Sequence, residues 1–306
     1  MRIYHSIQEF SAHNPILTIG MFDGVHAGHR EILAHLESEK KAYQGESVLL
    51  TFWPHPQVFF GKAEGFKMLT SLDEKLELLE QTGLDACLVL PFTNEFANLS
   101  PEDYITQIIH QGIGARKVII GYDHKYGKNG SGTFELMQEF AQKLHFELER
   151  IDAYSIESKA ISSTKVRNAL SLGDIKTANS YLTYNYFIDG TIVAGAQIGR
   201  TLGFPTANLQ LNFSQKMLPA DGVYACYTFV NGEKYASVVN IGTNPTIQKE
   251  LPLTIEIHLL DFQGDIYGEQ VRGQFVSRLR NEQQFFSREA LQEAIKKDIA
   301  VARTVL

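Results

Sequence analysis

The rhythm of the sequence changes near residue 184, and this change constrains the fold more than any other feature. From residue 16 to about 150, short apolar runs alternate with helix-like segments, whereas short alternating runs separated by Gly, Asn and Asp follow Tyr184. Alternating strands and helices are typical of a parallel α/β sheet, and closely spaced short strands are typical of a small antiparallel barrel. A length of 306 residues accommodates two such domains. We therefore predict a first domain over 1–182 and a second over 183–306.

The first domain is predicted to be a Rossmann-like parallel sheet with helices on both faces. Ser71 with Glu74 forms a capping box, and Ser100 precedes a proline at a first helical position, so both mark helix starts. In such sheets the crossovers are right-handed and ligands bind at the carboxyl ends of the strands. The buried strands are predicted from the apolar runs 16–19, 47–52, 85–90 and 117–121.

The second domain is predicted to be a small antiparallel β-barrel followed by one helix. Asn231-Gly232 is a hairpin signal between two of its runs. An amphipathic helix is expected from Ser287, with apolar residues spaced three to four apart. The strands are predicted from 187–194, 223–230, 235–240, 254–260 and 270–275.

Composition excludes some classes of function. The net charge of −7 argues against an extended nucleic-acid surface, which needs a basic face. The N-terminus lacks the apolar segment of a signal peptide, and no stretch approaches the apolar length of a membrane span. Cys87 and Cys226 fall in different predicted domains among apolar neighbours, so we expect reduced core thiols. These features predict a cytoplasmic protein whose partners are small molecules, and they leave the oligomeric state open.

A Gly-rich stretch, 20–30 (GMFDGVHAGHR), follows the apolar run 16–19 and precedes a helix-forming segment. A strand, a tight turn and a helix N-terminus in this order leave backbone N–H groups free to bind an anion. His26 and His29 lie at this turn, and Gly28 between them leaves room for a phosphate. Two donors without a neighbouring nucleophile suit nucleotidyl transfer by charge stabilisation. The alternative is a pair of surface histidines after a strand.

Three further segments of the first domain carry candidate ligand-binding side chains, each with an ordinary alternative. The loop 53–56 (WPHP) holds His55 between two prolines, which also suits a merely rigid connection. The segment 121–127 (GYDHKYG) contains Tyr126, which could stack on a planar ring or pack in the core. The segment 161–167 (ISSTKVR) has hydroxyls that cap a helix or bind phosphate, and an arginine one turn in.

In the second domain, 195–208 (GAQIGRTLGFPTAN) is rich in glycine but lacks the ending of a Walker A loop. Its backbone amides could nevertheless wrap a phosphate. Thr206 and Asn208 stand two apart, so in an extended segment both side chains share one face. A hydroxyl and an amide oxygen suit Mg²⁺ held on nucleotide phosphates. An ordinary turn is the alternative.

These motifs resemble one family over almost the whole chain. The stretch 20–30 resembles the phosphate-binding motif of the HxGH nucleotidylyltransferases, and its 22–25 (FDGV) is similar to their flavin-adenylylating branch. The segment 161–167 resembles the second ATP-phosphate motif of that superfamily, and 199–208 closely resembles the riboflavin kinase signature. Further matching blocks are 219–224 and 240–246. The chain thus resembles the bacterial bifunctional riboflavin kinase/FMN adenylyltransferases.

The resemblance implies two reactions in series. The barrel domain would phosphorylate riboflavin with ATP and Mg²⁺ to give FMN. The first domain would then join AMP from a second ATP to FMN, giving FAD and pyrophosphate. Both are in-line displacements at phosphorus, in which positioning and charge neutralisation lower the barrier. The alternatives are another HxGH transferase, which would have no reason to carry the barrel block, and a flavin-binding module, which would be expected to lose the phosphate-handling residues.

For adenylyl transfer the resemblance implies catalytic roles for His26, His29 and Arg167. FMN would bind at His55, Asp123 and Tyr126. Three positions depart from the family pattern: Trp53 replaces a usual acidic residue, His124 an aromatic residue and Gly130 a frequent arginine. ATP and its phosphates would bind residues of two motifs, namely Gly20, Phe22, Asp23, Gly24, His26, Gly28, His29, Ser162, Ser163, Thr164 and Arg167.

For the kinase the resemblance implies that Glu256 is the general base, which takes the proton of the ribityl 5′-hydroxyl. A strand carboxylate is otherwise usually on the solvated face. The flavin ring would lie against three residues of 279–285, namely Arg280, Glu282 and Phe285, although the arginine alone could be a linker charge. ATP would bind Gly195, Gly199, Arg200, Pro205, Thr206 and Asn208, and the last two would hold Mg²⁺.

Overall fold

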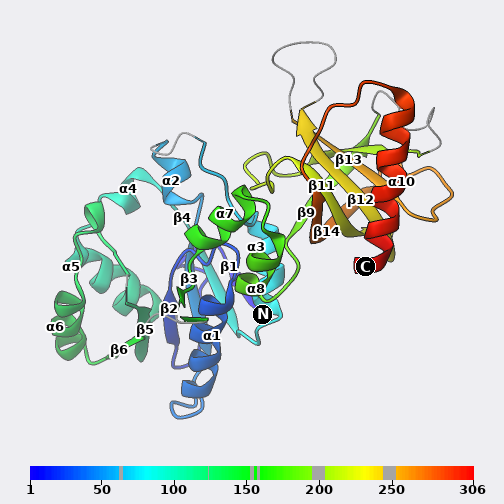
Figure 1. The fold of residues 1–306 in the computed structure, drawn as a ribbon. Coiled ribbons are helices and arrows are strands. Elements are labelled where there is room, and N and C mark those ends of the chain that lie inside the picture. The colour runs from blue at the N-terminus through cyan, green and yellow to red at the C-terminus, as the bar shows by residue number, and fades with distance from the viewer. Residues whose placement is uncertain (62–64, 123, 152–154, 157–158, 195–203, 244–252) are drawn as a thin grey trace. The chain divides into compact units, whose positions relative to one another are not determined.

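The computed structural model describes residues 1–61, 65–122, 124–151, 155–156, 159–194, 204–243 and 253–306. The chain divides into two compact units, Met1–Ser162 and Ser163–Leu306 (Figure 1). The first unit contains a parallel sheet and the second contains an antiparallel barrel, so both predicted architectures are confirmed. The compact units meet at 162/163, whereas the sequence predicts a boundary between functional domains at 182/183. The two helices between these positions belong to the second compact unit, and the functional boundary stays a prediction.

Six parallel strands form the sheet of the first unit, in the order β1-β4-β3-β2-β5-β6. From β2 the chain proceeds to β3 and β4 on one side and to β5 and β6 on the other. The switch point of the topology therefore lies between the carboxyl ends of β2 and β5, where ligands bind in sheets of this kind. The strands are β1 (Arg2–Tyr4), β2 (Ile16–Ile19), β3 (Ser47–Trp53), β4 (Ala86–Pro91), β5 (Lys117–Gly121) and β6 (Glu147–Ile151).

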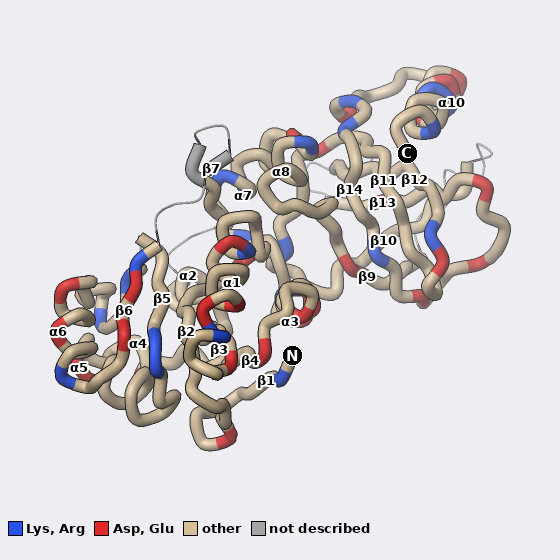
Figure 2. Tube along the Cα trace, turned by 90° about the horizontal axis from the view of Figure 1, so that it is seen from below, with Lys and Arg blue, Asp and Glu red and all other residues tan. Residues whose placement is uncertain are grey.

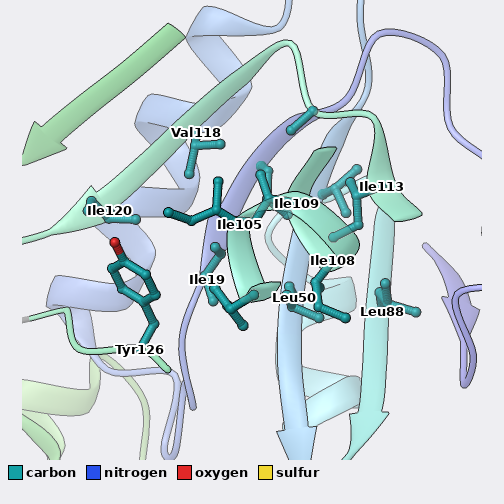
Figure 3. Close-up of a cluster of buried hydrophobic side chains, with 14 of the residues drawn as sticks. Ile19, Leu50, Leu88, Ile105, Ile108, Ile109, Ile113, Val118, Ile120 and Tyr126 are labelled. Atoms are coloured by element: carbon teal, nitrogen blue, oxygen red, sulfur yellow. The ribbon is translucent and has the colours of Figure 1, made fainter. Parts of the chain in front are cut away.

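Helical segments cover both faces of this sheet. On one face, a cluster that includes Ile19, Leu50 and Val118 packs against Ile105 and Ile109 (Figure 3). The capping box and the cap at the proline are both confirmed. The helical segments are α1 (Ala27–Glu39), α2 (Pro56–Phe59), α3 (Leu72–Glu80), α4 (Asn94–Ala97), α5 (Pro101–Asp103), the π-helical η1 (Tyr104–Ile113), η2 (Lys128–Gly130) and α6 (Phe134–Leu144). Strand β7 (Ser155–Ile156) pairs antiparallel with β8 (Lys159–Ala160).

A charged network ties α1 to the amino ends of the strands, away from the switch point. Lys117 Nζ lies 2.5 Å from Glu39 and 2.7 Å from Glu149, and His35 Nε2 lies 2.8 Å from Glu149. Figure 2 shows that α1, β5 and β6 carry both acidic and basic positions. The network fixes the far end of α1, so that the start of this helix is held at the switch point.

The second unit is a closed antiparallel barrel with the strand order β10-β13-β12-β11-β14-β9. Asn231 and Gly232 both have positive φ, at 49° and 83°, so the predicted hairpin turn is confirmed. The C-terminal helix is capped by Ser287, as predicted. The elements are α7 (Ser163–Ser171), α8 (Ile175–Leu182), β9 (Phe187–Val193), β10 (Ala207–Leu211), β11 (Gly222–Val230), β12 (Glu233–Thr243), β13 (Leu253–Leu259), β14 (Gln270–Arg280) and α10 (Arg288–Val305).

The barrel has an inner core and an outer apolar patch. Tyr224 and Phe275 are fully buried and their rings meet edge to face at 5.3 Å. On the outer face, Val223, Ala225 and Val238 pack against Ala302 of α10. The helix therefore covers one side of the barrel.

Helices α7 and α8 are anchored on the barrel. The Asn179 amide donates to the carbonyl of Phe275 at 2.9 Å, and the N–H of Ala220 donates to the carbonyl of Leu170 at 2.9 Å. Arg278 donates to the carbonyl of Leu172 at 3.2 Å. These bonds explain why both helices belong to the second compact unit, although their sequence motif resembles part of a nucleotidylyltransferase.

Candidate active sites

The Gly-rich turn follows β2 at the switch point, as the sequence predicts. Phe22, Gly24 and Val25 all have positive φ, which winds the chain tightly into helix α1. His26 is the N-cap of α1, and its Nδ1 accepts the N–H of His29 at 3.3 Å. The remaining free N–H groups of the first helical turn therefore face the mouth of the switch point, where an anion is favoured.

The two histidines stack on each other, with ring centroids 3.6 Å apart and planes inclined by 15°. Phe22 stacks on the other side of His29 at 4.4 Å. Burial, with smaller contributions from His26 and Lys75, holds the pKa of His29 well below its usual value. Within the described residues the Nδ1 atom of His29 is buried and has no hydrogen-bond partner. This neutral ring thus keeps one polar atom available for a ligand.

Glycines keep the turn open. A Cβ on Gly28 would lie 3.3 Å from the His26 ring, and one on Gly20 would lie 3.0 Å from the Phe22 ring. Both contacts are tighter than ordinary packing allows, so a side chain at either position would displace a ring of the stack. The expectation that Gly28 leaves room for a phosphate stays a prediction.

Asp23 serves as an internal anchor of the turn. Its side chain is buried, and its oxygens accept the N–H of Leu69 at 3.0 Å and the N–H and hydroxyl of Thr70 at 3.0 and 3.1 Å. The N–H of Gly24 donates to the same hydroxyl at 3.2 Å. These bonds give Asp23 a structural role, whereas the resemblance had suggested contact with ATP, which stays a prediction.

We expect Asp23→Ala to destabilise the first unit by about 2–5 kcal/mol, because it leaves two buried N–H groups without acceptors. Trp53 is the only tryptophan of the chain and lies in this unit, so its fluorescence during urea unfolding measures the effect. Asp73→Ala, at an exposed position of α3, is the matched control. A stable Asp23→Ala protein with a raised KM for ATP would instead support direct contact with the nucleotide.

Beside the turn, a chain of aromatic rings runs along the carboxyl ends of β3 and β4. Phe92 contacts Phe59 and Phe96 at 5.3 and 5.7 Å, and Phe96 contacts Tyr104 at 5.9 Å. Tyr104 contacts Tyr126 at 5.3 Å. Sequence reasoning identified only the last of these rings, and the signal for the others was the density of phenylalanine after the predicted strands.

The other FMN candidates differ in their surroundings. Tyr126 is 5% exposed and its hydroxyl donates to the carbonyl of Thr133 at 2.9 Å, so it packs in the core, as one alternative anticipated. His55 caps α2 and its ring lies 4.9 Å from that of Phe66. The His124 ring stacks at 5.8 Å on Tyr126, and burial lowers its pKa to about 4.

On the barrel, three polar side chains stand side by side across neighbouring strands. Glu256 of β13 is directly opposite Asn208 of β10 on one side and Asn240 of β12 on the other. Its chain neighbours Ile255 and Ile257 are buried inside the barrel, so the three polar residues share the outer face. Sequence reasoning did not select Asn240, because only strand register reveals that it lies beside Glu256.

The Glu256 carboxyl is half-buried on this face. Burial raises its pKa, and a hydrogen bond with the Thr206 side chain opposes the rise. Thr206, Asn208 and Glu256 are therefore brought together on this face. A hydroxyl, an amide and a carboxyl of raised pKa form a set that can bind phosphate-linked metal and accept a proton.

The same row continues through Val223 to Arg280, its next partners across the strands. The Arg280 guanidinium donates to both oxygens of Asp298 of α10 at 2.8 to 3.0 Å and lies 5.5 Å from the Phe285 ring. Arg280 is thus oriented by α10 rather than standing as a free linker charge. Glu282 packs against Gly242, where any side chain would overlap its carboxyl.

Comparison with known proteins decides the family. A FAD synthetase model matches residues 8–165 and a riboflavin kinase model matches 182–306. Relatives described as bifunctional riboflavin kinase/FMN adenylyltransferase are 36% identical in Bacillus subtilis, over 96% of this chain and 93% of theirs, and 34% identical in Escherichia coli K12, over 99% and 96%. The chain belongs to the bifunctional riboflavin kinase/FMN adenylyltransferase family. A crystal structure described as a macrolide-efflux protein from Streptococcus pneumoniae shares the fold, with 28% identity, a TM-score of 0.88 and 98% of each chain covered.

The family assignment confirms the resemblance and the domain order, whereas the individual site residues stay predictions. Ser162 ends the first compact unit, and Ser163, Thr164 and Arg167 begin α7 in the second, so their approach to the histidines is predicted by sequence alone. The carbonyl of Pro205 and the Nδ1 atom of His258 are hydrogen-bonded at 2.8 Å, close along the chain to Thr206 and Glu256. The predicted ligand residues Asp123, Gly195, Gly199 and Arg200 lie outside the described residues.

In the part of the chain that the structure describes, none of the helices combines the length and apolar character needed to cross a bilayer. Across the same described ranges, no three His, Cys, Asp or Glu side chains gather as a metal centre would require.

Proposed function

We propose that the barrel unit phosphorylates riboflavin at the row formed by Asn208, Glu256 and Asn240, and that the sheet unit adenylylates FMN at the Gly-rich turn. The observation that carries the kinase assignment is the register that places Glu256 between two asparagines on one barrel face. The observation that supports the adenylyltransferase assignment is the neutral His29 ring with a buried, unpartnered Nδ1 at a helix N-terminus.

In the kinase step, Glu256 accepts the proton of the ribityl 5′-hydroxyl while the oxygen attacks the γ-phosphorus of ATP and ADP leaves. The raised pKa of Glu256 improves it as a base at neutral pH. Mg²⁺, held by Thr206 and Asn208 together with nucleotide phosphates, would neutralise phosphate charge. Arg280, oriented by Asp298, would pair with acceptors of the flavin.

In the second step, a phosphate oxygen of FMN attacks the α-phosphorus of a second ATP, and pyrophosphate leaves. Both phosphates are already ionised at neutral pH, so the step requires no base. His26, His29 and the first-turn N–H groups of α1 would stabilise the polyphosphate, and the sequence resemblance assigns the same phosphate-binding role to Ser163 and Arg167. The aromatic chain around Phe92 offers apolar surface for the flavin ring.

The proposal is tested by incubating the full chain with riboflavin, ATP and Mg²⁺ and separating the flavins by chromatography. We expect FMN first and FAD later, and supplied FMN should give FAD without riboflavin. Accumulation of FMN alone would contradict the assignment of the sheet unit. Tight flavin binding without either product would instead identify a flavin-binding module.

We expect Asn208→Ala to raise the KM for Mg²⁺–ATP in FMN formation by about 10- to 100-fold. This range corresponds to the loss of one polar contact with a charged group, about 10- to 100-fold in affinity. Conversion of supplied FMN to FAD should stay at the parental rate. A Mg²⁺ titration of both steps provides the measurement, and Gln210→Ala, exposed on the same strand, provides the control. Unchanged kinase activity at every Mg²⁺ concentration would overturn the role of Asn208.

A further inference from the structure

Lys75 lies behind the Gly-rich turn, although no sequence motif singles it out. It follows the capping box of α3 and is 1% exposed. Its Nζ donates to the carbonyl of Met21 at 3.3 Å and to the Thr51 hydroxyl at 3.0 Å, and it stands 5.7 Å from the centroid of the Trp53 ring. The Thr51 hydroxyl donates in turn to the same Met21 carbonyl at 3.3 Å. One ammonium therefore connects α3, the end of β3 and the turn that carries the histidines.

The Lys75 ammonium has only neutral hydrogen-bond partners. Within the described ranges, no carboxylate lies at ion-pair distance from its Nζ, and Asp23, which acts on it from farther away, is itself saturated by Leu69 and Thr70. Burial lowers the pKa of Lys75 to about 8, against the smaller opposing effects of Cys87 and Asp23. At pH 7 the amine is still protonated, so this region of the unit holds a buried positive charge without a counter-ion, which is costly.

His29 does not contribute a positive charge to this region. Burial, together with His26 and Lys75, keeps His29 neutral at pH 7. Lys75, by contrast, stays protonated at pH 7 and is a buried cation behind the turn. It lies on the side of the sheet where the thirteen-residue helix α1 also presents its N-terminus, and both features attract anions.

We propose that Lys75 is a positioning residue of the adenylyl-transfer site. Its buried charge holds the Met21 carbonyl, and hence the turn, in place, and the phosphates of the bound nucleotide provide its missing counter-charge. This inference rests on the proposed function of the sheet unit. Because the attraction is electrostatic, it depends on the polyphosphate and not on the adenine or the flavin.

The test uses Lys75→Met, which keeps an unbranched apolar stem and removes the charge. FAD formation is measured from supplied FMN and ATP, and the reverse reaction is measured from FAD and pyrophosphate, which gives FMN and ATP. We expect the KM for ATP and for pyrophosphate to rise by roughly tenfold or more, because a close charge pair in a partly buried site is lost. The KM for FMN, and FMN formation from riboflavin, should stay near parental values.

Lys143→Met is the matched control. Lys143 lies on α6 of the same unit and is exposed. It pairs with Glu139 and lies 5.3 Å from the centroid of the Phe140 ring, and its removal changes the net charge equally. A uniform loss of turnover in Lys75→Met, with the KM for ATP and pyrophosphate unchanged, would indicate a packing role and overturn the proposal. If the parent forms no FAD from FMN, the proposed function fails instead, and the two failures are thereby distinguished.

The pH dependence gives a second measurement. In the parent, kcat/KM for pyrophosphate should fall as pH rises through about 8, because the free protein loses the Lys75 proton. The titratable groups that act on this amine do not share that range, since the pKa of His29 lies well below 6.5 and that of Cys87 is raised to about 12. This decline should be absent in Lys75→Met and persist in Lys143→Met. A decline that persists in Lys75→Met would contradict the proposal.

A measurement on the parent decides the matter even where Lys75→Met does not fold. NMR of the lysine ¹³Cε signals should show one lysine that titrates near pH 8, and saturating pyrophosphate should move that titration to higher pH. An upward shift supports the proposal. The absence of a lysine that titrates below about pH 9.5, or a titration that pyrophosphate leaves unmoved, overturns it.

Discussion

Replacing His29 with Ala should slow FAD formation from FMN and ATP by about 10²- to 10³-fold, the usual cost of removing one positioned donor from a charge-stabilising site. The His29 ring is stacked between Phe22 and His26, and its buried Nδ1 has no partner among the described residues. A ligand phosphate is the natural partner for that atom. FMN formation from riboflavin should continue unchanged, because the proposed kinase site lies in the barrel unit.

The measurement follows FMN and FAD separately by chromatography under single-turnover conditions. His35→Ala is the control, since His35 lies on the same helix but pairs with Glu149 at the far end of the sheet. Urea unfolding followed through Trp53 shows whether loss of the ring stack has unfolded the unit. Loss of both products in a folded His29→Ala protein would contradict two independent sites.

The neutral state of His29 also predicts a pH response. Its pKa is lowered, so the ring becomes protonated only below the usual histidine range. If the neutral ring is the working form, FAD formation should not decline because of His29 as pH falls from 8 to about 6.5. A loss of rate that begins at higher pH and disappears in His29→Ala would indicate that the ring is charged in the resting site.

Local signals predicted most of the fold because they arise from neighbouring residues. The runs 16–19 and 117–121 have the bounds of β2 and β5, and the Ser71 capping box begins α3. Strand–helix alternation implies a parallel sheet because crossovers require it. The Asn231-Gly232 pair likewise predicted one hairpin turn of the barrel from two adjacent residues alone.

Partners that lie far apart in the sequence escaped prediction. Caps and periodicity define α7 as a helix, but they do not indicate that its end packs on the barrel through the Leu170 carbonyl and Arg278. Asn240 became a candidate only through its register with Glu256. Lys75 reads as an ordinary helix lysine, because the pattern of α3 does not show that its side chain extends beneath the turn.

At two residues the resemblance implies contact with a ligand, whereas the structure shows hydrogen bonds within the protein. Asp23 belongs to the motif that resembles an ATP site, yet its oxygens are taken by backbone N–H groups of 69–70. Arg280 belongs to the segment that resembles a flavin site, yet Asp298 of α10 holds its guanidinium. A sequence motif shows which residue types occur together. The hydrogen bonds show in addition that the polar atoms of Asp23 and Arg280 are bonded to other groups of the protein.

Replacing Glu256 with Gln should reduce kinase turnover by about 10²- to 10⁴-fold, the range for a lost general base. Gln keeps the shape of the side chain and can still hydrogen-bond Thr206, so the affinities for riboflavin and ATP should change little. FAD formation from supplied FMN should be untouched, because that reaction belongs to the sheet unit. The measurement is single-turnover FMN formation with both substrates saturating, and Glu233→Gln, at the exposed start of β12, is the control.

The pH profile separates a base from a merely supportive carboxylate. Burial raises the pKa of Glu256, so on acidification it becomes protonated at higher pH than an ordinary glutamate and can no longer accept the hydroxyl proton. The parental kinase rate should therefore decline on the acidic side from above the usual glutamate range, and Glu256→Gln should lack that decline. A Gln variant within about threefold of the parent, far from the range of a lost base, would mean that the proton leaves by another route. In that case Asn208 and Asn240 would flank a carboxylate that only binds, and the nucleotide itself would have to accept the proton.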